Sequence, residues 1–194
     1  MSVRRVVTVP FWEERPEVEG ELLLRLNLGK GDQTAFGFGS HPTTSMALAL
    51  LGGLYGPAAP KPRRVLDVGC GSGILGIAAA RLGATEVLGI DPAPAAMSVA
   101  PENAVRNGVG DRCRFEPTLV GEVPGTFDLV LANLTAPLFA DLHEAVCARA
   151  RGGFLIVSGF NDLRLDIEDC FLGGQLKNRL WRAGWRALLL RYRE

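Results

Sequence analysis

The sequence Arg64-Val-Leu-Asp-Val-Gly-Cys-Gly-Ser-Gly73 is followed by an apolar run from Ile74 to Leu82 and then by Val87-Leu-Gly-Ile-Asp91. Short apolar runs beside glycines are typical of buried strands, and the Ala-, Leu- and Ile-rich run between them is typical of a helix. The stretch therefore predicts one β-α-β unit. In such a unit, glycines let a ligand approach the helix N-terminus closely, and an acid after the second strand can accept hydrogen bonds from both ribose hydroxyls. We expect a nucleotide-type cofactor site that includes Asp91.

The glycines fit two motifs that imply different chemistry. Gly71, Gly73 and Gly76 spell GxGxxG, with an acid about 20 residues further on, as in a dinucleotide-dependent oxidoreductase. Gly69, Gly71 and Gly73 instead spell GxGxG behind Asp67, which then lies at the carboxyl end of the strand and can meet a cationic ligand such as S-adenosylmethionine. An unpaired carboxylate inside the strand would be costly. This favours a methyltransferase, and an NAD-dependent oxidoreductase remains the alternative.

Composition limits the remaining function classes. The 194 residues are 47% hydrophobic with a formal net charge of +0, which suits one domain with a good core. The neutral balance argues against a nucleic-acid partner. The four cysteines form no CxxC pair and no cluster with a histidine, so we expect no metal site and free thiols in a reducing cytoplasm. No apolar stretch reaches the roughly 20 residues of a membrane helix, so we expect no membrane partner.

The rest of the chain predicts one α/β domain over residues 1–194. Residues 1–62 read as an N-terminal strand at 6–9, a half-buried strand from 22 to 28, and a Gly-rich loop that leads into a helix at Pro42, where the helix can cover the cofactor site. Residues 63–194 read as a Rossmann-like core. Its further elements are expected at 94–107, with a kink or break at Pro101, and at 113–116, 127–133, 137–150, 153–158, 162–170 and a terminal hairpin over 176–192.

Several separated motifs resemble the ribosomal protein L11 methyltransferase family. They are Ala35-Phe-Gly-Phe-Gly-Ser-His-Pro-Thr-Thr44, Val65-Leu-Asp-Val-Gly-Cys-Gly-Ser-Gly-Ile-Leu75, Gly89-Ile-Asp-Pro92, Glu102-Asn-Ala-Val-Arg-Asn-Gly-Val109 and Leu131-Ala-Asn-Leu134. The resemblance implies a class I S-adenosylmethionine-dependent methyltransferase fold, with a seven-stranded sheet, helices on both faces and a C-terminal antiparallel hairpin.

The resemblance also assigns site residues. It carries cofactor contacts onto Thr44, Gly69, Asp91 and Asn133, beside Asp67 and Gly71 from the glycine motif. Asn133 follows a strand, and in open α/β sheets the loops after the strands hold the ligand. We therefore expect Asn133 to face the transferring methyl and to be the catalytic residue.

Two departures from the family stand out: the first concerns the geometry of the loop before Pro42, and the second concerns the methyl acceptor. The family's loop usually has Thr where this chain has Phe38, and its members usually carry an N-terminal recognition domain, which we expect this chain to lack. Recognition is then expected from the rim of the catalytic domain, at 36–41, 133–137 and 161–174. This favours one lysine or amino terminus of a protein partner over several sites of L11. A methyltransferase of a small molecule or RNA, and a cofactor-binding module without catalysis, are the alternatives.

Overall fold

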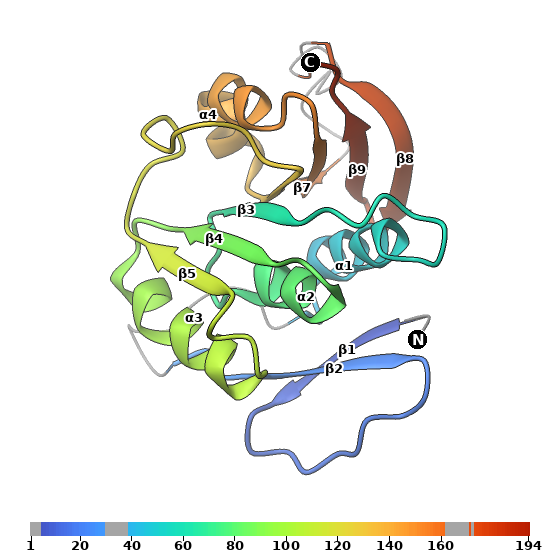
Figure 1. Ribbon diagram of the computed structural model, residues 1–194, viewed down its shortest axis with the longest axis vertical. Helices are drawn as coiled ribbons and strands as arrows, with labels where there is room; N and C mark the ends of the chain where they lie inside the picture. Colours follow the sequence, from blue (N-terminus) through green and yellow to red (C-terminus); the bar gives the residue numbers. More distant parts are fainter. Residues whose placement is uncertain (1–4, 30–38, 162–170, 172) are drawn as a thin grey trace.

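A seven-stranded sheet forms the centre of the structure, a computed structural model that describes residues 5–29, 39–161, 171 and 173–194 (Figure 1). The strand order is β5-β4-β3-β6-β7-β9-β8. Strands β3 to β7 pair in parallel along the sheet, and β9 runs antiparallel to both β7 and β8. Their bounds are β3 Arg64–Val68, β4 Glu86–Ile90, β5 Cys113–Glu116, β6 Leu129–Asn133, β7 Phe154–Asn161, β8 Gln175–Arg182 and β9 Trp185–Arg191. The predicted sheet and terminal hairpin are confirmed.

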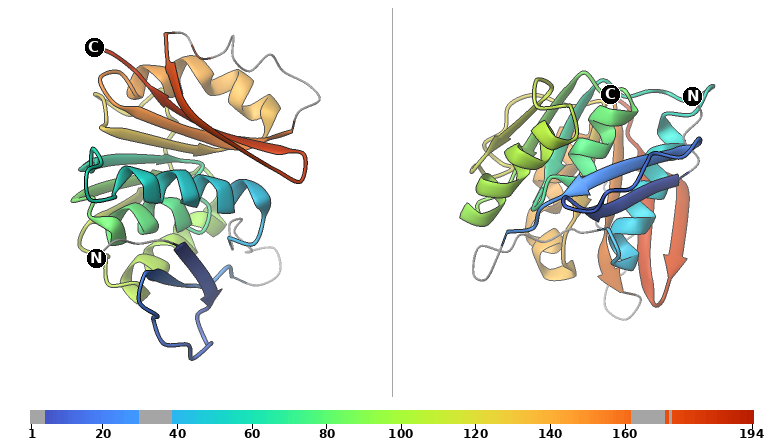
Figure 2. Two further views of the ribbon diagram at one scale, coloured as in Figure 1. Left: turned by 90° about the vertical axis from the view of Figure 1, so that its right-hand side faces the viewer. Right: turned by 90° about the horizontal axis from the view of Figure 1, so that it is seen from below.

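Helices cover both faces of this sheet (Figure 2). α1 (Pro42–Leu54), α2 (Ile74–Leu82) and α3 (Pro94–Arg106) lie on one face, and α4 (Ala136–Arg149) lies on the other. Adjacent strand residues point to opposite faces, so Val65 packs with α1 and α2 whereas Leu66 packs with Phe139 of α4. Because both faces are covered, the parallel strands consist of continuous apolar runs.

A separate pair of parallel strands, β1 (Arg5–Pro10) and β2 (Glu21–Leu26), packs on the outer side of α1 and α2 (Figure 2). Leu22, Leu24 and Leu26 point into the core beneath these helices. The alternating pattern predicts that the other side of β2 is exposed, but Leu23 is buried there with Val7 and Val9. The expectation of a half-buried strand is wrong at this residue, because β1 supplies apolar neighbours that the local pattern does not reveal.

Helix α3 contains the second difference from expectation. It is continuous from Pro94 to Arg106 despite Pro101, so no break occurs there. Pro101 and Glu102 are exposed. The next two residues, Asn103 and Ala104, are buried against the rest of the protein. Packing of this second half offsets the hydrogen bond that a proline removes. The helix ends before Gly108 (φ 70°), as predicted, and the expected helix at 162–170 lies outside the described residues.

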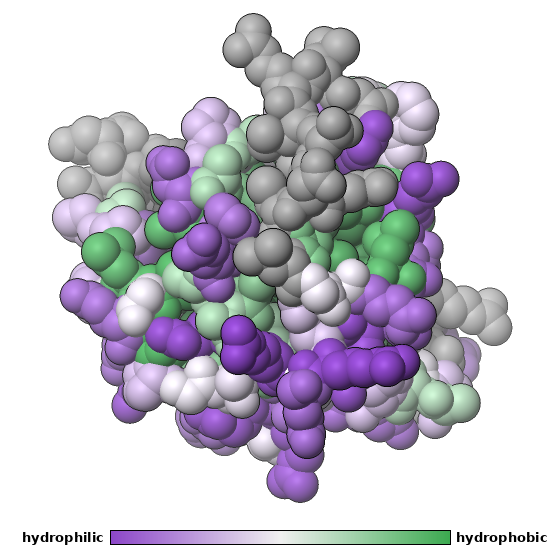
Figure 3. Space-filling view, turned by 90° about the horizontal axis from the view of Figure 1, so that it is seen from above, coloured by the Kyte–Doolittle hydropathy of each residue, from purple (hydrophilic) through white to green (hydrophobic). Residues whose placement is uncertain are grey.

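The surface offers no candidate for a bilayer-crossing segment in the part of the chain that the structure describes: each described helix is too short or too polar for that. On the face seen in Figure 3, hydrophilic side chains dominate the lower margin, and hydrophobic ones lie in separate groups nearer the middle. Large exposed apolar side chains, such as Trp12 and Trp181, are scattered over different elements.

Candidate cofactor pocket and active site

The turn between β3 and α2 is built on glycines with left-handed backbone conformations. Gly69 has φ 66° and Gly71 has φ 53°, a region that L side chains rarely adopt. A Cβ at Gly69 would also lie 2.5 Å from Cδ2 of Leu134. The Gly69 N–H donates to the carbonyl of Ile90 at the end of β4 (2.8 Å), which fixes the turn against the neighbouring strand. The glycines therefore bring bare backbone to the carboxyl edge of the sheet.

Asp91 lies beside this turn, directly after β4. One carboxylate oxygen accepts the Gly71 N–H and the other accepts the Ala93 N–H, both at 2.9 Å. The side chain is half-buried and lines a pocket. Because a carboxylate oxygen has more than one lone pair, each oxygen keeps capacity to accept a further hydrogen bond. The two backbone hydrogen bonds therefore fix the orientation of the Asp91 carboxylate without a ligand.

Asn133 occupies the last position of β6 and is held on both sides of its amide. Its Nδ2 donates to Thr44 Oγ1 (3.1 Å), and Ser158 Oγ donates to its Oδ1 (2.9 Å). Thr44 and Ser158 are completely buried, whereas Asn133 is half-buried and lines the same pocket as Asp91. The amide therefore has a fixed orientation, with one lone pair of its oxygen left for a reactant.

Asp67 lies one residue before the end of β3 and is buried. Its Oδ2 accepts the N–H of Gly76 in α2 (2.8 Å), and Gly76 has no room for a side chain because a Cβ would lie 2.9 Å from Val87. Burial raises the pKa of Asp67 to about 7, an effect that the Gly76 hydrogen bond opposes and the charge of Asp91 reinforces. The carboxyl group therefore titrates near neutral pH.

A pocket of about 400 Å³ joins these groups, within the usual size range of small-molecule sites. Four of the predicted site residues, Gly69, Gly71, Asp91 and Asn133, line it. The other two stand behind it: Thr44 supports Asn133, and Asp67 supports the β3–α2 turn. Further lining comes from His41, Thr43, Ala93, Ala95, Ala96, Leu134, Thr135, Leu138, Gly159 and Trp185.

The mouth of the pocket combines two segments that the sequence did not connect. His41 Nδ1 caps α1 by accepting the backbone N–H of Thr43 (3.4 Å), and it also lies 2.8 Å from Thr43 Oγ1. The His41 ring meets the ring of Trp185 in β9 edge to face, with 4.9 Å between the ring centroids. His41 belongs to the segment 36–41 that was expected at the rim, whereas the place of Trp185 at the pocket was not predicted. Phe38, where the chain departs from its family, lies outside the described residues.

Ser158 and Gly159 were also missed as site residues. Ser158 is the last residue of the strand predicted at 153–158, and Gly159 comes directly after it. This strand ends at the same edge of the sheet as the strand that carries Asn133, which was the available signal. Gly159 has φ 103°, and a Cβ there would collide with the carbonyl group of Leu134. Glycine is therefore required for β7 to pass close to the exit of β6.

The pocket suits an adenosine-type ligand. Asp91 offers carboxylate oxygens to ribose hydroxyls, the β3–α2 turn offers close backbone approach, and the alanines and Leu138 offer an apolar wall. Within the described residues, no three His, Cys, Asp or Glu side chains group as they would to hold a metal ion. These features, together with the strand order, define the fold class of S-adenosylmethionine-dependent methyltransferases of class I.

Comparison with known proteins gives the family. The sequence pattern of the ribosomal protein L11 methyltransferase family matches residues 2–187. A ribosomal protein L11 methyltransferase of Geobacter sp. (strain M21) is 44% identical over 159 residues, covering 80% of this chain and 51% of the relative. One of Pelobacter propionicus is 39% identical over 194 residues, covering 98% and 57%. The chain belongs to this family, as its motifs predicted, and spans about half the length of these curated relatives.

A solved structure agrees with this assignment over nearly the whole chain. The crystal structure of ribosomal protein L11 methylase from Lactobacillus delbrueckii subsp. bulgaricus superimposes with a TM-score of 0.84 at 34% sequence identity. The match covers 98% of this chain and 96% of that one. Both the core and the N-terminal strands therefore follow an arrangement already seen in a relative.

Proposed function

We propose that this chain is an S-adenosylmethionine-dependent methyltransferase that methylates an amine of a protein, either a lysine or an amino terminus. The observation that carries the proposal is the fixed amide of Asn133, which stands between Thr44 and Ser158 at the wall of a pocket that Asp91 and the β3–α2 turn complete. The names of the relatives support a protein acceptor, since they refer to a ribosomal protein. We also propose that residues 1–194 act as one unit in the cytoplasm.

The chemistry asks the protein mainly to hold two reactants in line. The cofactor, when bound, supplies a methyl carbon already activated by a positively charged sulfur; the amine nitrogen bonds to this carbon while the carbon–sulfur bond breaks toward sulfur. In our proposal, Asp91 holds the ribose, and Asp67 fixes the start of α2 behind the turn through its hydrogen bond with Gly76. Asn133 Oδ1 and the carbonyl of Leu134 accept hydrogen bonds from the amine, which aims its lone pair at the methyl. The amine proton leaves to solvent, and no residue acts as a required general base.

Calorimetry tests the cofactor assignment. We expect the protein to bind S-adenosylmethionine and S-adenosylhomocysteine and to show no appreciable heat with NAD or NADP. Tight nicotinamide binding without a response to the methyl donor would overturn the proposal and restore the oxidoreductase alternative. Binding without methyl transfer to any acceptor would identify a cofactor-binding module instead.

Radiolabelled methyl donor tests the acceptor. The protein is incubated with lysate from a strain that lacks its gene, and with purified L11, and labelled products are separated and mapped by mass spectrometry. We expect label on one lysine or amino terminus of a protein. Label on several sites of L11 would contradict the single-site prediction, and label on RNA or a small molecule alone would contradict the protein-amine assignment.

A further inference from the structure

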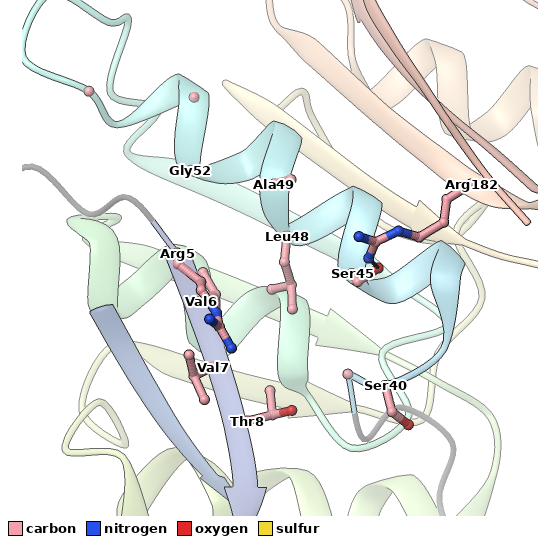
Figure 4. Close-up of a pocket in the computed structure, with 13 residues that line it drawn as sticks. Arg5, Val6, Val7, Thr8, Ser40, Ser45, Leu48, Ala49, Gly52 and Arg182 are labelled. Carbon is pink, nitrogen blue, oxygen red and sulfur yellow. Dashed lines mark hydrogen bonds between the residues drawn. The ribbon is translucent and has the colours of Figure 1, made fainter. Parts of the chain in front are cut away.

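A groove of about 950 Å³ runs along α1, outside the cofactor pocket and more than twice its volume. One wall is β1, the floor is the outer face of α1, and Arg182 of β8 stands at one end (Figure 4). Its described lining comprises Arg5, Val6, Val7, Thr8, Gly39, Ser40, Ser45, Leu48, Ala49, Gly52, Gly53, Gly56 and Arg182. The proposed function does not use this groove.

The wall formed by β1 is a strand edge with no further strand paired to it among the described residues. Among the described strands, β1 pairs only with β2. The N–H groups of Arg5 and Phe11 donate toward the β2 side, so odd-numbered residues direct their backbone groups to β2. By strand alternation, the backbone N–H and C=O of Val6 and Thr8 point to the edge of β1 that faces away from β2. Such an edge is a template for an added strand.

The floor of the groove leaves space that internal packing does not use. Gly52 and Gly53 lie inside α1, where glycine is destabilising relative to alanine. A Cβ at either position would meet no atom within 4 Å, and neither glycine has a positive φ. Neither the backbone nor the packing of the described residues therefore explains them. They leave open space along this face of the helix.

The two ends of the groove are positively charged. Arg182 Nη1 donates to Ser45 Oγ (3.3 Å), which places its guanidinium over the N-terminal part of α1 (Figure 4). The Arg5 side chain is 70% exposed and lies 3.9 Å from Glu21, a loose ion pair. No acidic side chain is among the described residues that line the groove. An occupant with carboxylates near both ends is therefore electrostatically favoured.

The groove meets the cofactor pocket at the start of α1. Ser40 and Ser45 line the groove, whereas His41 and Thr43, between them in the sequence, line the pocket. On the hairpin side, Arg182 lines the groove and Trp185, three residues later, lines the pocket. A chain that leaves the groove past Arg182 therefore arrives at the pocket mouth beside His41 and Trp185.

We propose that an extended acidic segment of the methyl-accepting protein binds in this groove as an added strand on β1, and that its target amine enters the pocket beside Trp185. This inference rests on the proposed protein methyltransferase function and adds to it a docking surface and the chemical character of the acceptor.

Two variants block the groove in different ways. Gly52→Gln fills the floor with a long neutral side chain at a position that has room for it, and Gly52→Ala is its matched control, since it changes helix propensity similarly but fills little space. Arg182→Glu reverses the charge at one end. Its matched control is Arg179→Glu, because Arg179 is exposed on the same strand but does not line the groove.

The probes are two dye-labelled synthetic peptides with one lysine and alternating valine, carrying either glutamates or glutamines at the remaining positions. Fluorescence anisotropy measures their binding in the presence of S-adenosylhomocysteine. We expect the unmodified protein to bind the glutamate peptide more tightly than the glutamine peptide. We expect Gly52→Gln and Arg182→Glu to bind the glutamate peptide at least about tenfold more weakly than their control variants do. Label transfer to lysate proteins should fall in the same two variants, while calorimetric cofactor affinity stays unchanged in all four.

Several results would overturn the docking proposal. These are no binding of either peptide to the unmodified protein, equal binding of the two peptides, or normal label transfer by Gly52→Gln and Arg182→Glu. A dimer in light scattering that Gly52→Gln dissociates would instead assign the groove to a second copy of the chain. If the unmodified protein does not bind the cofactor, the proposed function itself is contradicted. Failure of the docking proposal and failure of the proposed function are therefore distinguishable.

Discussion

Substitution of Asn103 by alanine should weaken cofactor binding from a position outside the pocket. Asn103 is completely buried in α3 and makes three side-chain hydrogen bonds. Its Oδ1 accepts the N–H of Asn27 (2.7 Å), and its Nδ2 donates to the carbonyls of Asn27 (2.8 Å) and Ser72 (2.9 Å). Ser72 lies in the glycine turn beside Asp91, so Asn103 ties that turn to the segment that follows β2.

The magnitude follows from the groups that the variant leaves unpaired. Each buried backbone group that loses its partner costs about 1 to 3 kcal/mol, and relaxation and water entry recover part of this. We expect Asn103→Ala to lower the free energy of unfolding by about 2 to 4 kcal/mol. We expect the affinity for S-adenosylhomocysteine to fall by about three- to tenfold, because a looser turn must be ordered on binding.

Asn107→Ala is a matched control on the same helix. Asn107 also makes three side-chain hydrogen bonds, with the N–H and C=O of Arg25 and with the carbonyl of Asn103, but none with the glycine turn. Urea unfolding should show a similar loss of stability in both variants, whereas calorimetry at a temperature where both are folded should show weaker binding only for Asn103→Ala. Equal affinities in the two variants, or normal affinity in Asn103→Ala, would refute the proposed link.

Three further predictions concern the pocket itself. Asp91→Ala should weaken the binding of S-adenosylmethionine by about 1 to 3 kcal/mol, because a held carboxylate is lost from the ribose, and calorimetry would contradict this if affinity were unchanged. Asn133→Ala should reduce the rate of single-turnover methyl transfer more than it reduces cofactor affinity. Ser158→Ala removes only one support of the Asn133 amide and should show a smaller effect of the same kind. A loss confined to cofactor affinity would exclude Asn133 from the chemistry. Asp67 should make a pH-dependent contribution to the free energy of unfolding, because its pKa in the folded protein is raised to about 7. This stabilising contribution is fully present below the pKa of Asp67 in the unfolded chain, near 4, and is lost as pH rises through about 7. Asp67→Asn should lack this contribution, which is on the order of 4 kcal/mol at most. Urea titrations of both proteins at several pH values between 4 and 9 test this, and a difference in the free energy of unfolding that stays constant over this range would disprove the assignment.

The sequence by itself determined most of the described elements and their order, although not the continuity of α3 through Pro101. Apolar runs beside glycines located β3, α2 and β4, and Asn107-Gly108 marked the end of α3. Local chemistry is sufficient there, because turn formation, helix capping and the apolar character of doubly covered strands depend on residues close in the chain. The position of Asp91 just after β4 and of Asn133 at the end of β6 also followed, since the carboxyl ends of parallel strands meet at one edge of the sheet.

Only the tertiary structure decided which side chains meet. Asn133 and its partner Thr44 are 89 residues apart, and no local pattern indicates that Thr44 supports Asn133 while Asp91 lines the pocket itself. The burial of Leu23 and the pairing of β1 with β2 are decided in the same way. Propensity and periodicity describe one element at a time, whereas these contacts depend on how separate elements pack, and that depends on the burial and hydrogen bonding of the whole chain at once.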